Sequence, residues 1–150
     1  MKNFSKLIIL TALFIGCSMI GNAQEIGVRF GNISGGNVAI DAVFSTGEFS
    51  RIHADFSVGD GDVALDVLWD FVYMPLGDET LNWYAGVGPY AVLGDPFWMG
   101  AIGEIGLEYK FDSVPISISA DYRPSLSIIE ETKFHYDGFG INIRYNFGRY

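Results

Sequence analysis

The segment 137–147 alternates at every step between large apolar side chains and small or polar ones. The apolar positions are Phe139, Ile141, Ile143, Tyr145 and Phe147. Between them lie Gly138, Gly140, Asn142, Arg144 and Asn146. Successive side chains of a β-strand point to opposite sides, so this segment predicts a strand with one bulky apolar face and one small polar face.

The same alternation recurs through most of the chain after residue 24, and no segment there shows a helical period. It predicts seven further strands, at 26–31, 38–44, 51–58, 63–73, 83–93, 101–111 and 116–123. In the fifth of these, Gly86, Gly88 and Pro89 interrupt the alternation, and either face could be the apolar one.

Eight strands in simple up-and-down order match the smallest transmembrane barrel. We therefore predict an all-β fold, an eight-stranded antiparallel up-and-down transmembrane β-barrel. With both chain ends at the periplasmic side, the outer loops begin near Asn32, Gly59, Gly94 and Pro124. The turns at the opposite end lie near Thr46, Pro75 and Asp112.

The volume of the side chains indicates which face is outside. Large residues such as Trp69, Phe71 and Tyr109 crowd the apolar rows, whereas an eight-stranded interior holds only a modest filling or one small ligand. The apolar rows also carry no charge, and a cation on the lipid face of a barrel costs about 2–4 kcal/mol at the bilayer centre. The pattern favours a lipid-facing apolar surface. The alternative is a soluble secreted barrel of the lipocalin kind, with its apolar face inside.

Residues 1–23 have the features of a cleaved secretory signal peptide, which leaves residues 24–150 as the barrel domain. The segment has two lysines near its start, Lys2 and Lys6, continues with a short apolar core and ends in the small-residue sequence Gly21-Asn22-Ala23. Its apolar core is too short to span a bilayer. A lipoprotein signal is the alternative, because Cys17 stands near the end of that core, and whether Cys17 is lipidated stays open.

Removing that segment changes the composition in two useful ways. Two lysines are lost, so the formal charge goes from −9 to −11, with seven basic residues against 18 acidic ones. This acidic balance argues against nucleic acid as a partner. The single cysteine is lost as well, so the mature chain forms no internal disulfide.

The polar rows of the predicted strands place ionisable side chains inside the barrel. These residues are Arg29, Asp41, Arg51, His53, Asp55, Asp66, Asp70, Glu104, Glu108, Lys110, Asp121, Arg123 and Arg144. One interpretation is an ion path or a carboxylate site. We favour a network of salt bridges that fills a closed lumen, because eight strands leave no wide channel and buried charges must pair.

Aromatic side chains gather toward one rim of the predicted barrel, where amphipathic rings settle at a headgroup boundary. They are Tyr73, Trp83, Tyr109, Phe111, Tyr145 and Phe147. We interpret them as an aromatic girdle at the periplasmic rim.

The sequence offers little for catalysis or for metal and cofactor binding. His53, Asp55 and Ser57 share one side of a strand and look like a hydrolase set, but same-face neighbours lie about 6.5–7 Å apart, at twice the rise per residue. They therefore do not pass protons directly, and a hydrogen-bonding role in the lumen is favoured. The turn Asp60-Gly61-Asp62 falls far short of a calcium loop. We predict no catalytic residue, no metal site and no cofactor.

Several stretches resemble the small outer-membrane β-barrel proteins of the OmpA/OmpX kind, in the form common in Bacteroidetes. The residues that carry this likeness are Ala23-Gln24, Trp83–Tyr90, Gly106–Phe111, Ala120–Pro124 and Ile143–Phe147. The resemblance implies a porin-like monomer in the outer membrane of a Gram-negative cell, in contact with outer-membrane lipid and inserted by the barrel assembly machinery. In this chain Gly148-Arg149-Tyr150 follow Phe147, so which aromatic residue is the terminal insertion signal stays open.

The expected role is structural, adhesive or envelope-stabilising, through the outer loops. The loop Pro124–Tyr136 is the longest and carries Ile128, Ile129, Phe134 and Tyr136, so it is the best candidate for contact with an extracellular ligand; the alternative is an ordinary solvated loop. One alternative is an enzyme that modifies outer-membrane lipid, of the lipid A deacylase or acyltransferase kind. The other is a soluble secreted ligand-binding barrel.

Overall fold

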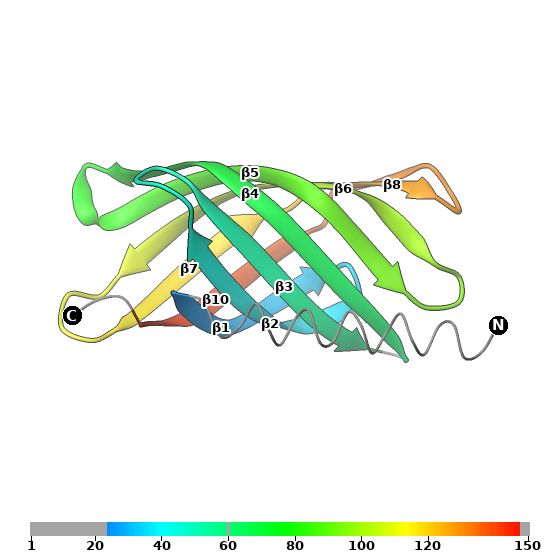
Figure 1. Ribbon diagram of the computed structural model, residues 1–150, viewed down its shortest axis with the longest axis horizontal. Helices are drawn as coiled ribbons and strands as arrows, with labels where there is room; N and C mark the ends of the chain where they lie inside the picture. The colour runs from blue at the N-terminus through cyan, green and yellow to red at the C-terminus, as the bar shows by residue number, and fades with distance from the viewer. Residues whose placement is uncertain (1–23, 60, 148–150) are drawn as a thin grey trace.

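The structure, a computed structural model, describes residues 24–59 and 61–147; the predicted signal peptide at 1–23 and the tail after Phe147 lie outside them. The described residues form ten strands (Figure 1). These are β1 (Glu25–Ile33), β2 (Gly36–Ser45), β3 (Arg51–Gly59), β4 (Asp62–Leu76), β5 (Asp78–Leu93), β6 (Trp98–Lys110), β7 (Ile116–Tyr122), β8 (Ser125–Ile129), β9 (Lys133–His135) and β10 (Phe139–Asn146). In this part of the chain no helix is long and apolar enough to cross a membrane.

The strands close into a barrel with eight antiparallel strand positions. We call each position a stave, because two of the eight are made of two strands of the chain. The order of the strands is β5-β4-β3-β2-β1-β10-β7-β6, and a further pairing of β5 with β6 closes the ring. β7 and β8 both pair with β6 and together make one stave, interrupted at Arg123 and Pro124. β9 pairs with β8 just before β10 pairs with β7, so β9 and β10 make the last stave. The predicted closed eight-stranded antiparallel barrel is confirmed.

The first and last strands of the chain lie side by side. β1 and β10 pair in an unbroken antiparallel register that runs from Glu25 opposite Asn146 to Gly31 opposite Gly140. Next to this ladder, the amide of Phe147 donates a hydrogen bond to the carbonyl of Gln24, with an N–O distance of 2.8 Å. Sequence-distant segments therefore complete the ring.

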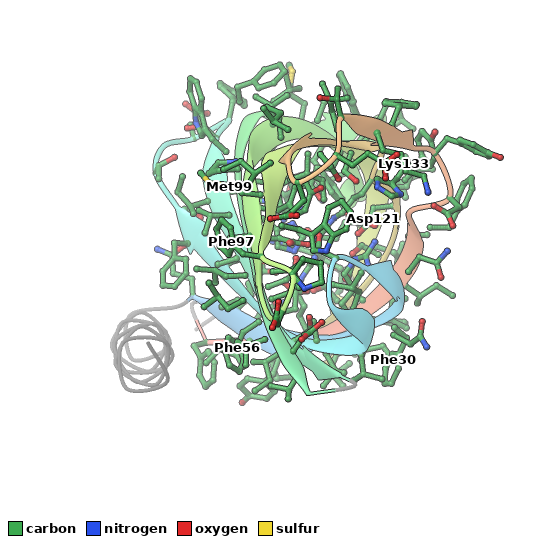
Figure 2. The ribbon with its side chains drawn as sticks, turned by 90° about the vertical axis from the view of Figure 1, so that its right-hand side faces the viewer. Phe30, Phe56, Phe97, Met99, Asp121 and Lys133 are labelled. Atoms are coloured by element: carbon green, nitrogen blue, oxygen red, sulfur yellow. The ribbon has the colours of Figure 1, made fainter. Side chains whose placement is uncertain are left out.

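The barrel turns its apolar rows outward and its polar rows inward. In β1, Arg29 is fully buried, whereas its neighbours Val28 and Phe30 are 37% and 47% exposed. The view along the barrel places Phe30 and Phe56 outside the ring of strands and Asp121 within it (Figure 2). The predicted orientation of the two faces is confirmed, and the face arrangement of a lipocalin-like barrel is not the one adopted.

The interior contains one small apolar cluster among its polar side chains. Ala64, Leu68, Tyr90, Val92 and Ile102 form this cluster, and Trp98 packs against it. These residues come from β4, β5 and β6, so they cover one side of the interior toward the end where β6 begins. We call this end the far end and the opposite one the near end.

The connections divide between the two ends as predicted. The near end holds the β2–β3, β4–β5 and β6–β7 turns together with the start of β1 and the end of β10, and the far end holds the β1–β2, β3–β4, β5–β6 and β8–β9 connections (Figure 1). The β4–β5 connection is much shorter than expected, because β4 continues to Leu76 and β5 starts at Asp78. Gly77 makes this turn with a φ of 87°, a conformation that favours glycine.

The predicted long loop, Pro124–Tyr136, is mostly a hairpin. β8 pairs with residues 99–102 of β6, and β9 pairs back onto β8. Proline lacks an amide hydrogen and interrupts the stave, but its carbonyl accepts a hydrogen bond from the amide of Gly103, with an N–O distance of 2.9 Å. The strand therefore resumes after Pro124, and the hairpin lengthens the barrel wall at the far end.

Candidate functional site

The interior is the candidate site, and the structure places there the residues assigned to the lumen from the sequence. Lys110 is half-buried, with a side chain 20% exposed. The remaining twelve residues are all buried: Arg29, Asp41, Arg51, His53, Asp55, Asp66, Asp70, Glu104, Glu108, Asp121, Arg123 and Arg144. They come from seven of the eight staves, so opposite walls of the barrel meet through their side chains.

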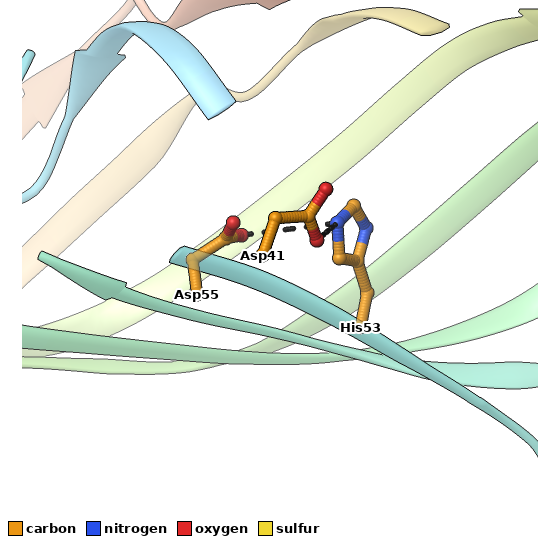
Figure 3. Close-up of side chains that lie close together, drawn as sticks. All are labelled: Asp41, His53 and Asp55. Carbon is orange, nitrogen blue, oxygen red and sulfur yellow. Dashed lines mark hydrogen bonds and ion pairs between the residues drawn. The ribbon is translucent and has the colours of Figure 1, made fainter. Parts of the chain in front are cut away.

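His53 of β3 lies at the centre of this network. Its Nε2 atom is 2.6 Å from Oδ1 of Asp41, its neighbour on β2 (Figure 3). On the other side of the ring, Nδ1 is 3.1 Å from Oε1 of Glu104 on β6. Two guanidinium groups approach the same ring: Arg123 Nη2 lies 3.1 Å from both ring nitrogens, and Arg144 Nη2 lies 3.0 Å from Nε2. The imidazole thus joins acidic and basic groups from opposite walls.

Arg123 crosses the barrel. It follows β7, and its Nη1 donates a short hydrogen bond to Asp55 on β3, four staves away around the ring. Its Nε donates to Oε2 of Glu104 at 2.9 Å and lies 3.5 Å from Oδ1 of Asp121. A guanidinium presents its donors in a fixed planar fork, so one arginine holds three carboxylates in place.

Arg144 of β10 makes a second set of cross-barrel contacts. Its Nε donates to Oδ2 of Asp41 at 2.5 Å, and its Nη1 donates to Oε2 of Glu108 at 2.6 Å and to the Ser119 hydroxyl at 3.1 Å. Asp41 and Glu108 lie on β2 and β6, which face each other across the ring. Charge-assisted contacts of this kind are among the strongest hydrogen bonds in proteins, so Arg144 braces three staves.

Arg51 of β3 links the network to the near end. Its Nε donates to Asp70 at 2.7 Å and its Nη1 to Glu108 at 3.0 Å. Its Cζ atom also lies 4.3 Å from the centre of the Tyr73 ring and 4.4 Å from that of Tyr84. Stacking of this kind is favourable for a delocalised cation over an aromatic face.

Arg29 of β1 completes the set of buried arginines. Its Nη2 donates to Oδ1 of Asp121 at 2.6 Å, and Asn142 donates to the other oxygen of that carboxylate at 2.7 Å. Gly140 leaves room for this arrangement, because a Cβ atom there would overlap the Arg29 guanidinium. Gly106 likewise leaves room for the ring of Tyr84. The small inward residues thus make space for the large ones.

Tyr73 differs from the expectation for the aromatic girdle. A β-bulge between Asp70 and Val72 shifts the alternation of β4 by one residue and turns Tyr73 inward. Its hydroxyl donates to Oε1 of Glu108 at 2.8 Å. A bulge of this kind leaves no clear mark in the alternation of side chains, which is why the sequence did not reveal it.

The other girdle residues lie near the near end on the outer side. Trp83 is paired with Leu107, whose side chain is exposed. Two pairs of rings pack edge to face with centroids 5.0 Å apart: Tyr109 with Phe111 and Tyr145 with Phe147. The inward residues of β5 include Tyr84 and Tyr90, both buried, so the side-chain orientation of β5 that the sequence left open is settled.

The apparent hydrolase set is not assembled. His53 Nε2 lies 3.9 Å from Oδ2 of Asp55, beyond hydrogen-bonding distance, and the buried hydroxyl of Ser57 has no hydrogen-bond partner among the described residues. A nucleophilic serine needs a base within hydrogen-bond reach. All three side chains are buried in the barrel, so the geometry supports a structural role for His53.

Two groups of side chains in the described residues bring metal-ligating atoms within 4.8 Å of one another. They are Asp41–His53–Asp55 and His53–Asp70–Glu104. Arg123 and Arg144 donate to members of both groups and already supply positive charge there. The geometry therefore favours ion pairs over a metal ion at this position.

A cavity opens above the network at the far end. Its volume is about 580 Å³, and it lies between the β1–β2 loop, the start of β6 and the β8–β9 hairpin. Asp66 and Arg123 line its lower part, and Trp98 and Lys133 line its walls. Alternation places Asp66 inside the barrel, but the cavity depends on loop and hairpin positions that alternation does not specify.

The comparisons with known proteins add no relative. No family model, no curated protein and no solved structure matches this chain. Its function is therefore inferred from the two faces of the barrel and from the contents of its interior.

Proposed function

We propose that this protein is a small outer-membrane β-barrel of the OmpA/OmpX-like kind, exported through its signal peptide and monomeric in the membrane of a Gram-negative cell. Its role is structural, adhesive or envelope-stabilising, and not enzymatic. The observation that carries the proposal is the separation of charge from the apolar outer surface. In the described strands the outward rows carry large apolar side chains, and the only exposed charged residues are Glu79, at the start of β5, and Lys133, on the β8–β9 hairpin. Every arginine of the described residues is buried.

The extent of the apolar surface supports a lipid environment. Exposed large apolar residues occur on every stave, for example Phe30 on β1, Trp69 on β4 and Ile143 on β10. A water-soluble monomer rarely exposes a continuous apolar patch of more than a few hundred square ångströms, about 300–600 Å² at most. β1, β2 and β3 have nine, ten and nine residues, close to the roughly 9–11 residues that cross a bilayer in a tilted barrel.

The interior supports a filled barrel and not a pore. Ion pairs join β3 to Arg123, between β7 and β8, and join β2 to β6 through Arg144 of β10, so charged groups meet across the lumen. A closed sheet leaves no unpaired edge in the ring, which satisfies the backbone in hydrocarbon. The polar interior then serves to hold the staves at fixed positions.

The β8–β9 hairpin supports contact with a partner outside the cell. Ile128, Phe134 and Tyr136 are 60%, 58% and 72% exposed at the far end, which faces outward in this orientation. β9 pairs with β8 only, so its second edge has no strand partner among the described residues. Open strand edges accept an added strand from another chain. An extracellular ligand would therefore bind along β9.

Cell fractionation tests the location. The protein should remain with membranes after carbonate extraction, and its gel mobility should change on heating, because a folded barrel migrates differently from the denatured chain. A soluble periplasmic protein from the same cells provides the control. Mature protein that is folded and monodisperse in plain buffer without detergent would contradict the proposal.

A His53→Ala variant tests the absence of lipid chemistry. The lipid A of cells that carry this variant should have the same mass spectrum as that of cells with the unaltered protein. An acyl chain gained or lost only in the presence of His53 would instead identify an enzyme that acts on outer-membrane lipid.

A further inference from the structure

A row of three carboxylates crosses the inner wall of the barrel, and only two of them have a cationic partner. Asp41, Asp55 and Asp66 are directly paired across β2, β3 and β4. Arg144 binds Asp41 and Arg123 binds Asp55. Among the described residues, Asp66 has no ion pair within 4.0 Å.

Asp66 is nonetheless buried, with a relative exposure of 1%. The Ser34 side chain contributes a hydrogen bond to this carboxyl, but Oδ1 of Asp66 has no hydrogen-bond partner among the described residues. A buried carboxylate oxygen without a donor is costly. Asp66 also lines the lower part of the far-end cavity, so its carboxyl is the acidic group at the bottom of this cavity.

The remaining charges of the cavity favour a cation. Two further acids, Asp62 and Asp137, line the cavity, and one lysine, Lys133 of the hairpin, lines it as well. Figure 2 shows Lys133 at this end of the barrel. Arg123 also lines the cavity, but its guanidinium is already engaged by Asp55, Glu104 and Asp121. His135 is held by a contact of 3.2 Å between its Nε2 and the Ser127 hydroxyl. Free negative charge therefore exceeds free positive charge in the cavity.

The lining also suits an organic cation better than a metal ion. Tyr90 and Trp98 border the cavity, and aromatic faces attract alkylammonium groups. A calcium ion takes about six to eight oxygen ligands, whereas in the described residues neither group of clustered metal-ligating side chains includes Asp66. At about 580 Å³ the cavity falls within the range of about 300–1,000 Å³ that small-molecule sites occupy.

We propose that the far-end cavity binds a small organic cation through a primary ammonium group, which pairs with the Asp66 carboxylate at the bottom of the cavity and lies against Trp98. An ammonium has three donors and no acceptor, so it matches an acceptor-only carboxylate. The proposal does not depend on the cellular location of the barrel.

Calorimetric titration of the purified protein with the diamine putrescine tests this proposal. The protein is kept in plain buffer or detergent micelles according to its solubility. Saturable binding is expected for the unaltered protein, and the neutral diol analogue of putrescine should not bind. Asp66→Asn should weaken binding by about tenfold or more, because the charge-assisted hydrogen bond is lost. Glu48→Gln, the corresponding acid-to-amide change on an exposed residue at the near end, should leave binding unaltered.

Lys133→Ala gives a second test that does not disturb the buried row. Removing the cation of the hairpin should tighten putrescine binding by roughly twofold or more, since a nearby like charge is removed. The proposal is overturned if putrescine does not bind, if Asp66→Asn binds putrescine equally well, or if calcium binds at Asp66 and displaces putrescine. Equal binding to Asp66→Asn would mean that water satisfies this carboxylate.

Discussion

Arg123, which follows β7, forms an ion pair with Asp55 of β3 on the opposite side of the barrel, and both side chains are buried. Removing one partner leaves the other charge buried and unpaired. Arg123→Leu should therefore lower the free energy of unfolding by about 3–5 kcal/mol. Urea unfolding followed by gel mobility measures this change. Arg123→Leu combined with Asp55→Leu should recover part of the loss, and equal stability of the single variant and the unaltered protein would contradict the role of this pair.

The apolar outer face gives a test that separates lipid from water. Ile143 of β10 and Ile128 of β8 are 46% and 60% exposed, so an arginine at either site would be tolerated in water. In the proposed membrane only Ile143 lies on the lipid-facing wall, and Ile143→Arg should cost about 2–4 kcal/mol. Ile128→Arg, on the hairpin, is the matched control. The amount of folded protein in the membrane fraction measures both. Similar amounts for the two variants would count against a lipid-facing wall.

The inward glycine of β10 provides a steric test. A methyl group at Gly140 would overlap the Arg29 guanidinium, so Gly140→Ala should displace Arg29 from Asp121 and destabilise the barrel by about 1–3 kcal/mol. Gly103→Ala is the matched control, because the nearest atom to its Cβ would be a backbone oxygen 3.8 Å away. Thermal unfolding compares the two variants. A larger loss of stability for Gly103→Ala than for Gly140→Ala would show that the interior side chains move to make room for the added methyl group at position 140.

The filled lumen predicts poor ion conduction. Glu108 is shared by Arg51 and Arg144, with N–O distances of 3.0 and 2.6 Å, so charged groups occupy the middle of the barrel. The purified protein in a planar bilayer should give no large, steady openings. Openings that appear only in a variant with Arg51, Arg144 and Glu108 all changed to alanine would indicate that these side chains close the lumen. Steady openings of the unaltered protein would contradict the filled interior.

Alternation of side chains was sufficient to predict the barrel and its two faces. In β10 and the residue that follows it, five large apolar residues in the sequence 139–147 leave only one arrangement that keeps Arg144 away from the outer surface. A one-residue slip would turn every side chain to the other face, so the pattern specifies the orientation strongly. The same reasoning placed the ionisable residues inside before any contact between them was known.

Features that depend on a break in the alternation could not be predicted. The bulge at Phe71 turns Tyr73 inward. Pro124 predicts the end of a strand, but the stave continues after it as β8. In β5 the two faces are similar in size, and the choice between them follows from the pairing of Trp83 with Leu107 and from the burial of Tyr84 and Tyr90. The free oxygen of Asp66 reflects which arginines reach across the barrel, a three-dimensional property that a list of inward residues does not contain.

The seam between β1 and β10 has a consequence for how the chain assembles. Glu25 and Asn146 are paired although almost the whole described chain separates them. The barrel therefore cannot close until β10, its last strand, has been made and pairs with β1. Contacts between such remote segments slow folding, because a long loop must close before they form. Until that moment two strand edges stay open to any passing chain, and a helper that shields them would protect the newly made protein from aggregation.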